Sequence, residues 1–102
     1  MKKIEHIGIA VKNIDASNKL FAKIFGKDFY KLETIHSEGV TTSFFQIGDS
    51  KIELVSALDA ESPISKYLTK NREGIHHIAF AVEDIRSEMK RLKNQGIRLL
   101  NS

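Results

Sequence analysis

The 102-residue sequence contains no cysteine and no tryptophan, and it has a single proline. The absence of cysteine excludes disulfide bonds, zinc sites with thiolate ligands and cysteine nucleophiles. The apolar runs are a few residues long, far short of the roughly 18 that span a bilayer. Glu5, His6 and Lys12 interrupt what would be the apolar core of a signal peptide. We therefore expect a cytoplasmic protein that does not associate with membranes.

The sequence also has little excess of charge of either sign. Sixteen Lys and Arg face thirteen Asp and Glu, a formal net charge of +3, and the two signs are interspersed. This pattern indicates a solvated surface rather than a nucleic-acid-binding face. The six glycines are scattered, which excludes a glycine-rich phosphate loop, and no serine has a nucleophile-elbow pattern around it. The length and the 41% hydrophobic content predict one globular domain over residues 1–102.

An internal repeat is the main feature that is present. Residues 4–14 align with residues 75–85 at an offset of 71, and six of the eleven pairs are identical, including His6 with His77. In both copies a bulky residue alternates with a histidine or a small residue, which predicts a half-buried strand. The bulky face should pack on the following helix. The face of the histidine and the small residues should leave open space above the sheet.

The rest of each copy follows the same pattern. In the first, Asn13 or Asp15 can cap a helix that runs to about Phe25 and ends at Gly26, and strands are predicted over 29–35, 40–47 and 51–57. Residues 1–57 thus form a βαβββ unit. Residues 58–73 link the units through a short helix that begins at Pro63. Residues 74–102 start a second unit with a strand, a helix capped by Asp84, and a further strand over 97–100. We expect this second unit to be incomplete at its C-terminal end.

Three side chains are candidate metal ligands. The repeat places His6 and His77 on the open face of equivalent strands, and imidazole is the commonest protein ligand for borderline divalent metals. Glu53 lies between two apolar residues of a predicted strand, where a carboxylate needs solvent, a polar site or a cation. The pattern is equally compatible with a Glu53 that is exposed at a strand edge and with a Glu53 that is a metal ligand. His76 is predicted to point to the opposite face from His77 in a structural role, and His36 to be solvated in a turn.

These features together resemble the vicinal oxygen chelate superfamily, the glyoxalase-like proteins of paired βαβββ units in the α+β class, and within it the methylmalonyl-CoA epimerase family. The resemblance is carried by residues 4–11, 38–40, 52–54, 62–68, 74–80 and 96–100. Its most specific part is Ser62-Pro63-Ile64 followed by Gly74-Ile75-His76-His77-Ile78.

The resemblance implies the site and its chemistry. His6, Glu53 and His77 match family metal-ligand positions, and the fourth family ligand is a Glu in a last strand that would follow Ser102. The implied cofactor is a divalent ion such as cobalt, manganese, zinc or nickel. The implied reaction is epimerisation of an acyl-CoA substrate by removal of the α-proton through a metal-chelated enolate, in a homodimer. No residue is assigned as acid or base: Thr42 stands where some relatives carry a carboxylate base, and Glu38 is nearby.

Two other readings stay open. One is a different glyoxalase-like activity, such as a lactoylglutathione lyase or a ring-cleaving dioxygenase with a two-His-one-carboxylate iron site. The other is a glyoxalase-fold protein that binds a ligand without turnover. Metal content would separate an enzyme from a simple binder, and exchange of the substrate α-proton would separate an epimerase from the other enzymes.

Overall fold

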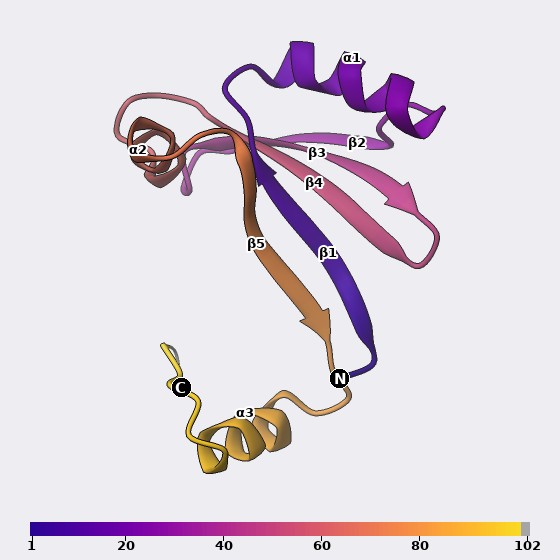
Figure 1. Cartoon of the computed structure of the whole chain (residues 1–102). Helices are drawn as coiled ribbons and strands as arrows, with labels where there is room; N and C mark the ends of the chain where they lie inside the picture. Colours follow the sequence, from indigo (N-terminus) through magenta and orange to yellow (C-terminus); the bar gives the residue numbers. More distant parts are fainter. Residues whose placement is uncertain (101–102) are drawn as a thin grey trace.

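The computed structural model describes residues 1–100 (Figure 1). Its elements are, in chain order, β1 (Lys3–Ala10), α1 (Ile14–Phe25), β2 (Lys31–Ile35), β3 (Val40–Ile47), β4 (Ser50–Ala57), α2 (Pro63–Lys70), β5 (Gly74–Ala81) and α3 (Ile85–Asn94). The first unit therefore has the predicted βαβββ order. The predicted unit boundaries fall at the end of β4 and the start of β5. The α+β class is confirmed.

The five strands form one sheet in the order β2-β3-β4-β1-β5. β1 runs parallel to β4 and antiparallel to β5, while β2, β3 and β4 are joined as antiparallel neighbours. A tight turn joins β3 to β4, and Ile47 and Ser50 pair across it. The equivalent strands of the two units, β1 and β5, therefore lie side by side.

Helix α1 covers one face of the sheet. Asn13 caps it as predicted, with a side chain that accepts a hydrogen bond from the backbone N–H of Ala16, and Gly26 ends it in the left-handed conformation at φ 73°. The side chains buried between α1 and the strands are Val11, Phe45 and Leu54. This confirms that the bulky face of the first repeat strand packs on its helix.

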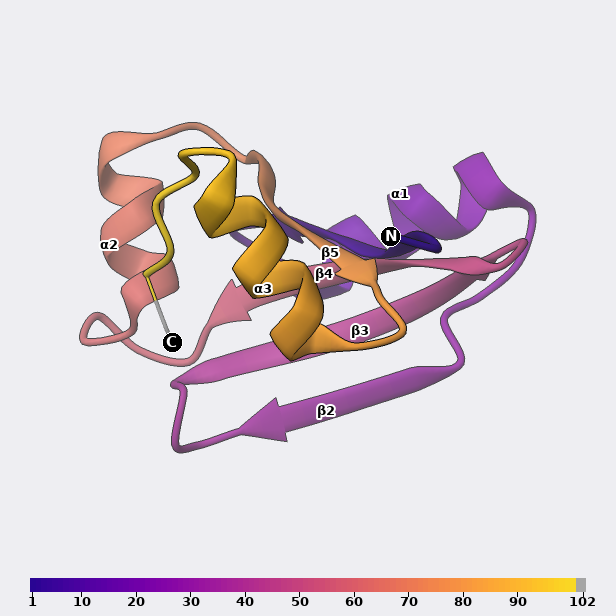
Figure 2. The same ribbon diagram turned by 90° about the horizontal axis from the view of Figure 1, so that it is seen from below.

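Helix α2 covers only part of the opposite face. Ser62 caps it and Pro63 occupies its first turn, where the missing N–H of proline has no cost. The buried apolar side chains beneath it are Ala10, Val40, Val55 and Ile64. Figure 2 shows α2 at one end of the sheet and α1 behind the strands. The rest of this face, where the histidine side of β1 lies, is left open.

The second unit departs from the prediction in two respects. Figure 1 shows α3 after the end of β5, separated from the sheet rather than packed against it, and Ile78 and Phe80 of β5 are 46% and 49% exposed. The predicted packing of this bulky face on its helix is therefore wrong for the described residues. Residues 97–100 do not form the predicted strand. The physical reason is that a strand needs a partner edge, and no described strand lies beside this segment.

Candidate metal centre in the open cleft

The three predicted ligands meet at one point on the open face of the sheet. His6 Nε2 lies 3.1 Å from His77 Nε2, and Glu53 Oε1 lies 3.2 Å from His77 Nε2 and 3.8 Å from His6 Nε2. The potential ligand atoms of these residues all lie within 4.8 Å of one another. Glu53 is thus not the exposed strand residue of the alternative reading, and its side chain is 15% exposed.

The strand register explains why these side chains meet. Gly8 of β1 pairs with Glu53 of β4 on one side and with His77 of β5 on the other. His6 lies two residues before Gly8, on the same face of β1. The imidazole of His77 occupies the space above Gly8, so that a Cβ on this glycine would lie 2.0 Å from His77 Cε1. The face of small residues predicted from the sequence therefore provides the space that the side chain of the candidate ligand His77 occupies.

His76 lies on the same side as His77, and the prediction that it points to the opposite face is wrong. Both histidines line the same cleft, and their Nδ1 atoms are 3.0 Å apart. The cause is an irregularity in the β1–β5 ladder, where Gly8 pairs with His77 but Ile9 pairs with Ile75. The skipped residue is a β-bulge, which re-aims a side chain that strict alternation would send to the other face.

Glu5 is a second residue that the prediction missed. Its Oε1 accepts a hydrogen bond from His6 Nδ1 at 2.6 Å, and its Oε2 lies 3.2 Å from Lys51 Nζ. The hydrogen bond to His6, followed by that to Lys51, lowers the pKa of the Glu5 carboxyl. The available signal was the repeat itself, because Glu5 and His76 occupy equivalent positions immediately before the two ligand histidines.

Burial lowers the pKa of the His77 imidazole, with the charge of Glu53 acting in the opposite direction. At neutral pH His77 is therefore uncharged, which is the form that can bind a metal through a nitrogen lone pair. In the cluster, two imidazole nitrogens and a carboxylate oxygen face one another at 3.1 to 3.8 Å. Such a group of acceptors attracts a cation, either a proton or a metal ion.

The spacing suits a single divalent ion. Ligand atoms that each lie about 2.0–2.1 Å from one ion are at most about 4.2 Å apart. All three distances in the cluster are below this limit. The donor set of two imidazoles and a carboxylate is also the kind that borderline divalent metals prefer. The residues present therefore fit a metal ion.

The cluster opens into a cleft of about 630 Å³, within the range of small-molecule sites. Its wall combines the ligands with apolar side chains of β3, β4 and α2, among them Val40, Val55 and Ile64. Glu38 and Thr42 also line it. Thr42 is 2% exposed, and its hydroxyl has no hydrogen-bond partner among residues 1–100. His36 does not line this cleft and is exposed in the turn after β2.

Comparison with known proteins decides the family. The model of the glyoxalase/bleomycin resistance protein/dioxygenase superfamily matches residues 5–102. The chain belongs to this superfamily.

Relatives of this superfamily chain include named enzymes. It is 37% identical over 98% of its length to an ethylmalonyl-CoA/methylmalonyl-CoA epimerase of Cereibacter sphaeroides, of which it covers 75%. It is 36% identical over 97% of its length to a mitochondrial methylmalonyl-CoA epimerase of Dictyostelium discoideum, and spans only 60% of that protein. Among solved structures, a Streptomyces coelicolor methylmalonyl-CoA epimerase in complex with 2-nitronate-propionyl-CoA aligns with a TM-score of 0.86 at 30% identity. That alignment covers 99% of this chain and 74% of the other.

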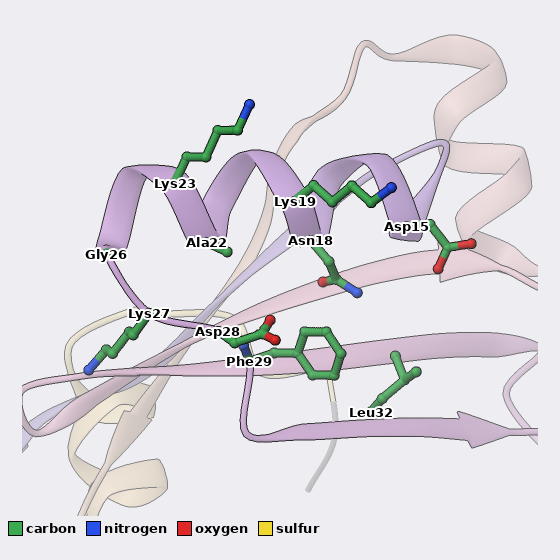
Figure 3. A pocket seen from close by; sticks show the side chains of 10 residues that line it. All are labelled: Asp15, Asn18, Lys19, Ala22, Lys23, Gly26, Lys27, Asp28, Phe29 and Leu32. Atoms are coloured by element: carbon green, nitrogen blue, oxygen red, sulfur yellow. The ribbon is translucent and has the colours of Figure 1, made fainter.

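A larger groove of about 870 Å³ lies between α1 and residues 26–32. Figure 3 shows its lining side chains, with Lys23 pointing away from the groove. This lining contains lysines and aspartates but no imidazole. Within residues 1–100, the potential metal-binding cluster lies in the histidine cleft instead. None of the described helices is both long and apolar enough to cross a membrane.

Proposed function

We propose that this chain carries the active site of a metal-dependent epimerase that acts on methylmalonyl-CoA or a closely similar acyl-CoA thioester. The observation that carries the proposal is the convergence of His6, Glu53 and His77 on one point of an open cleft. Relatives named methylmalonyl-CoA epimerase supply the substrate class. The metal, which we expect to be cobalt, manganese, zinc or nickel, would be held by these three side chains.

The reaction exchanges the hydrogen on the carbon between a thioester and a carboxylate. A divalent ion held by His6, Glu53 and His77 would supply positive charge that stabilises the negative charge developing when that hydrogen leaves as a proton. The apolar wall formed by Val40, Val55 and Ile64 excludes water from this charge and so strengthens electrostatic interactions inside the cleft. Delivery of a solvent-derived proton to the opposite face of the carbon inverts its configuration, and the proton first removed passes to solvent, so that no net atoms are gained or lost.

A proton acceptor is also required. Among the described residues that line the cleft, Glu38 is the carboxylate outside the ligand cluster. We assign proton transfer to Glu38, since Glu53 already faces the two imidazoles and a threonine such as Thr42 does not act as a base near neutral pH. Glu38 lies in the turn between β2 and β3, at the exposed side of the cleft.

The test is hydrogen exchange at the substrate. The protein loaded with each candidate divalent ion is incubated with methylmalonyl-CoA in deuterated water, and deuterium on the α-carbon is followed by NMR. We expect exchange with the wild-type chain and its loss in the His6→Ala and His77→Ala variants, which should also lose stoichiometric metal uptake. His36→Ala is the matched control, because His36 is exposed and outside the cleft.

The other readings give different results. Turnover of the glutathione adduct of methylglyoxal without α-exchange would indicate a lyase, and consumption of oxygen with a catechol would indicate a dioxygenase. Binding of the acyl-CoA without any turnover would indicate a ligand-binding protein. Homodimer formation and the cytoplasmic location stay predictions, and light scattering of the purified chain tests the first of them.

A further inference from the structure

The ladder between β1 and β5 skips one residue on each strand. On β1 the register passes from Ile4 to His6 and leaves out Glu5, and on β5 it leaves out His76. These two residues are equivalent in the repeat, since both directly precede a ligand histidine. A β-bulge frees a side chain from strict alternation and is a common device for aiming a residue at a site. Both units therefore use the same backbone irregularity at the same place.

Each bulged side chain contacts the outer nitrogen of the next histidine. Glu5 Oε1 lies 2.6 Å from His6 Nδ1, and His76 Nδ1 lies 3.0 Å from His77 Nδ1. In both ligand histidines the other nitrogen, Nε2, faces the shared centre. The repeat has thus produced two matching pairs, each with an inner ligand and an outer partner.

The chemistry of Glu5 determines the proton position on His6. An ionised carboxylate accepts hydrogen bonds and donates none, so His6 Nδ1 must carry the hydrogen. In neutral His6, Nε2 then has a free lone pair directed at the centre. Lys51 Nζ, 3.2 Å from the other oxygen of Glu5, holds the carboxylate in place.

His76 can act in the same way on His77. Of two neutral imidazole nitrogens 3.0 Å apart, one donates and the other accepts. If His77 donates, its Nε2 is free for the centre. The His76 ring is also fixed by an edge-to-face contact with Tyr67, whose ring centroid is 4.8 Å away.

We propose that Glu5 and His76 are paired positioning residues that hold His6 and His77 in the Nδ1–H tautomer and aim both Nε2 lone pairs at the metal position. This inference rests on the proposed function and deepens it. The alternative is that His6 and His77 have only a structural role. In that arrangement the Nε2–H of one histidine donates a hydrogen bond to Nε2 of the other across 3.1 Å. The two arrangements differ in the tautomer, which can be measured without any metal.

The experiment records long-range proton–nitrogen NMR spectra of the ¹⁵N-histidine-labelled, metal-free chain at pH 8. We expect the Nδ1–H pattern for His6 and His77 in the wild type, and a rise of the Nε2–H form of His6 in Glu5→Ala. Glu5→Gln should restore the wild-type pattern, since its amide oxygen still accepts a hydrogen bond. His76→Phe should change His77 alone. The matched controls are Glu83→Ala and His36→Phe, at exposed positions outside the cleft.

Calorimetric titration with Zn²⁺ provides the second readout. Loss of an outer partner typically weakens metal binding about 10- to 100-fold, and we expect this for Glu5→Ala and His76→Phe but not for the controls. An Nε2–H wild type, or tautomers and affinities that do not change in either variant, would overturn the inference. A wild type that binds no Zn²⁺ or other divalent ion while the tautomers respond as expected would overturn the proposed metal site and support the tautomer control. Amide spectra of each variant verify that it is folded.

Discussion

Replacement of Gly8 by alanine tests the geometry of the centre most directly. A Cβ at this position would lie 2.0 Å from His77 Cε1 and 2.5 Å from its Nδ1 and Nε2. Ordinary contact begins at 3.4 Å, so the ring must move by about 1.4 Å. Metal–ligand distances tolerate only about 0.2 Å. We therefore expect His77 to be lost as a ligand and metal affinity to fall about 100-fold, the upper end of the loss that follows when the support of a metal ligand is removed.

The stability of the metal-free chain should change little in Gly8→Ala. The His77 side chain is 37% exposed and can swing toward solvent, and alanine in a strand interior is favoured over glycine by about 0.5–1 kcal/mol. The stabilisation by metal should change strongly. At a metal concentration 100 times the wild-type Kd, the wild type gains about 2.7 kcal/mol and a 100-fold weaker variant about 0.4 kcal/mol. For a domain of this size, the difference corresponds to about 9–18 °C in the metal-induced shift of Tm.

The assay is thermal unfolding with and without metal, together with a calorimetric titration. The double variant Gly8→Ala/His77→Ala is the internal control, because it should bind metal no more weakly than His77→Ala alone if the glycine acts only through that ring. Gly8→Ala with an affinity within threefold of the wild type would refute the reasoning. So would additive losses in the double variant, which would show that Gly8 acts on the site by another route.

Three further predictions concern other parts of the chain. Thr42→Val should raise the free energy of unfolding in urea by about 1 kcal/mol, because it removes a buried hydroxyl that has no hydrogen-bond partner in the described part of the chain; a clear loss of stability would show that this hydroxyl is paired in solution. Glu38→Gln should lower the rate of substrate deuterium exchange about 10²- to 10⁴-fold with metal affinity unchanged, and a rate within threefold of the wild type would remove Glu38 as the base. Hydrogen bonds from the backbone N–H and hydroxyl of Ser87 lower the pKa of the Asp84 carboxyl. Its contribution to α3 is therefore complete above the unfolded pKa of about 3.9 and is lost as the pH falls through the lower folded value. Cα chemical shifts of α3 should show this loss on acidification, and Asp84→Asn should abolish it; an unchanged pH profile in that variant would contradict the capping role.

The local sequence was sufficient to predict the order of elements in the first unit and to identify the three candidate metal ligands. The alternation along residues 4–11 and the helix-end signals at Asn13 and Gly26 depend only on residues that are neighbours in the sequence. The repeated histidine placed His6 and His77 on equivalent strands, and the antiparallel pairing of β1 with β5 then brought them together. Glu53 was identifiable because a carboxylate is unusual between apolar strand residues.

The second unit shows the limit of local pattern. The same alternation that packs a partly buried Ile9 against the core beneath α1 leaves Ile78 and Phe80 exposed on β5. Amphipathic periodicity states which side chains share a face, but it does not state what covers that face. Only the position of α3, which stands apart from the strands, decides that these residues remain uncovered within the described chain (Figure 1).

The sequence by itself determined the kind of fold, the three candidate metal ligands and the open face on which they lie, because these follow from residue type and a period of two. The tertiary structure alone decided the surroundings of the ligands: the side of the sheet on which His76 lies, the contact of Glu5 with His6, and the burial of Thr42 in the cleft wall. The physical reason is that a bulge arises from the register between two strands that are about 70 residues apart in the chain. The alternation of side chains within one strand carries no information about this pairing between strands.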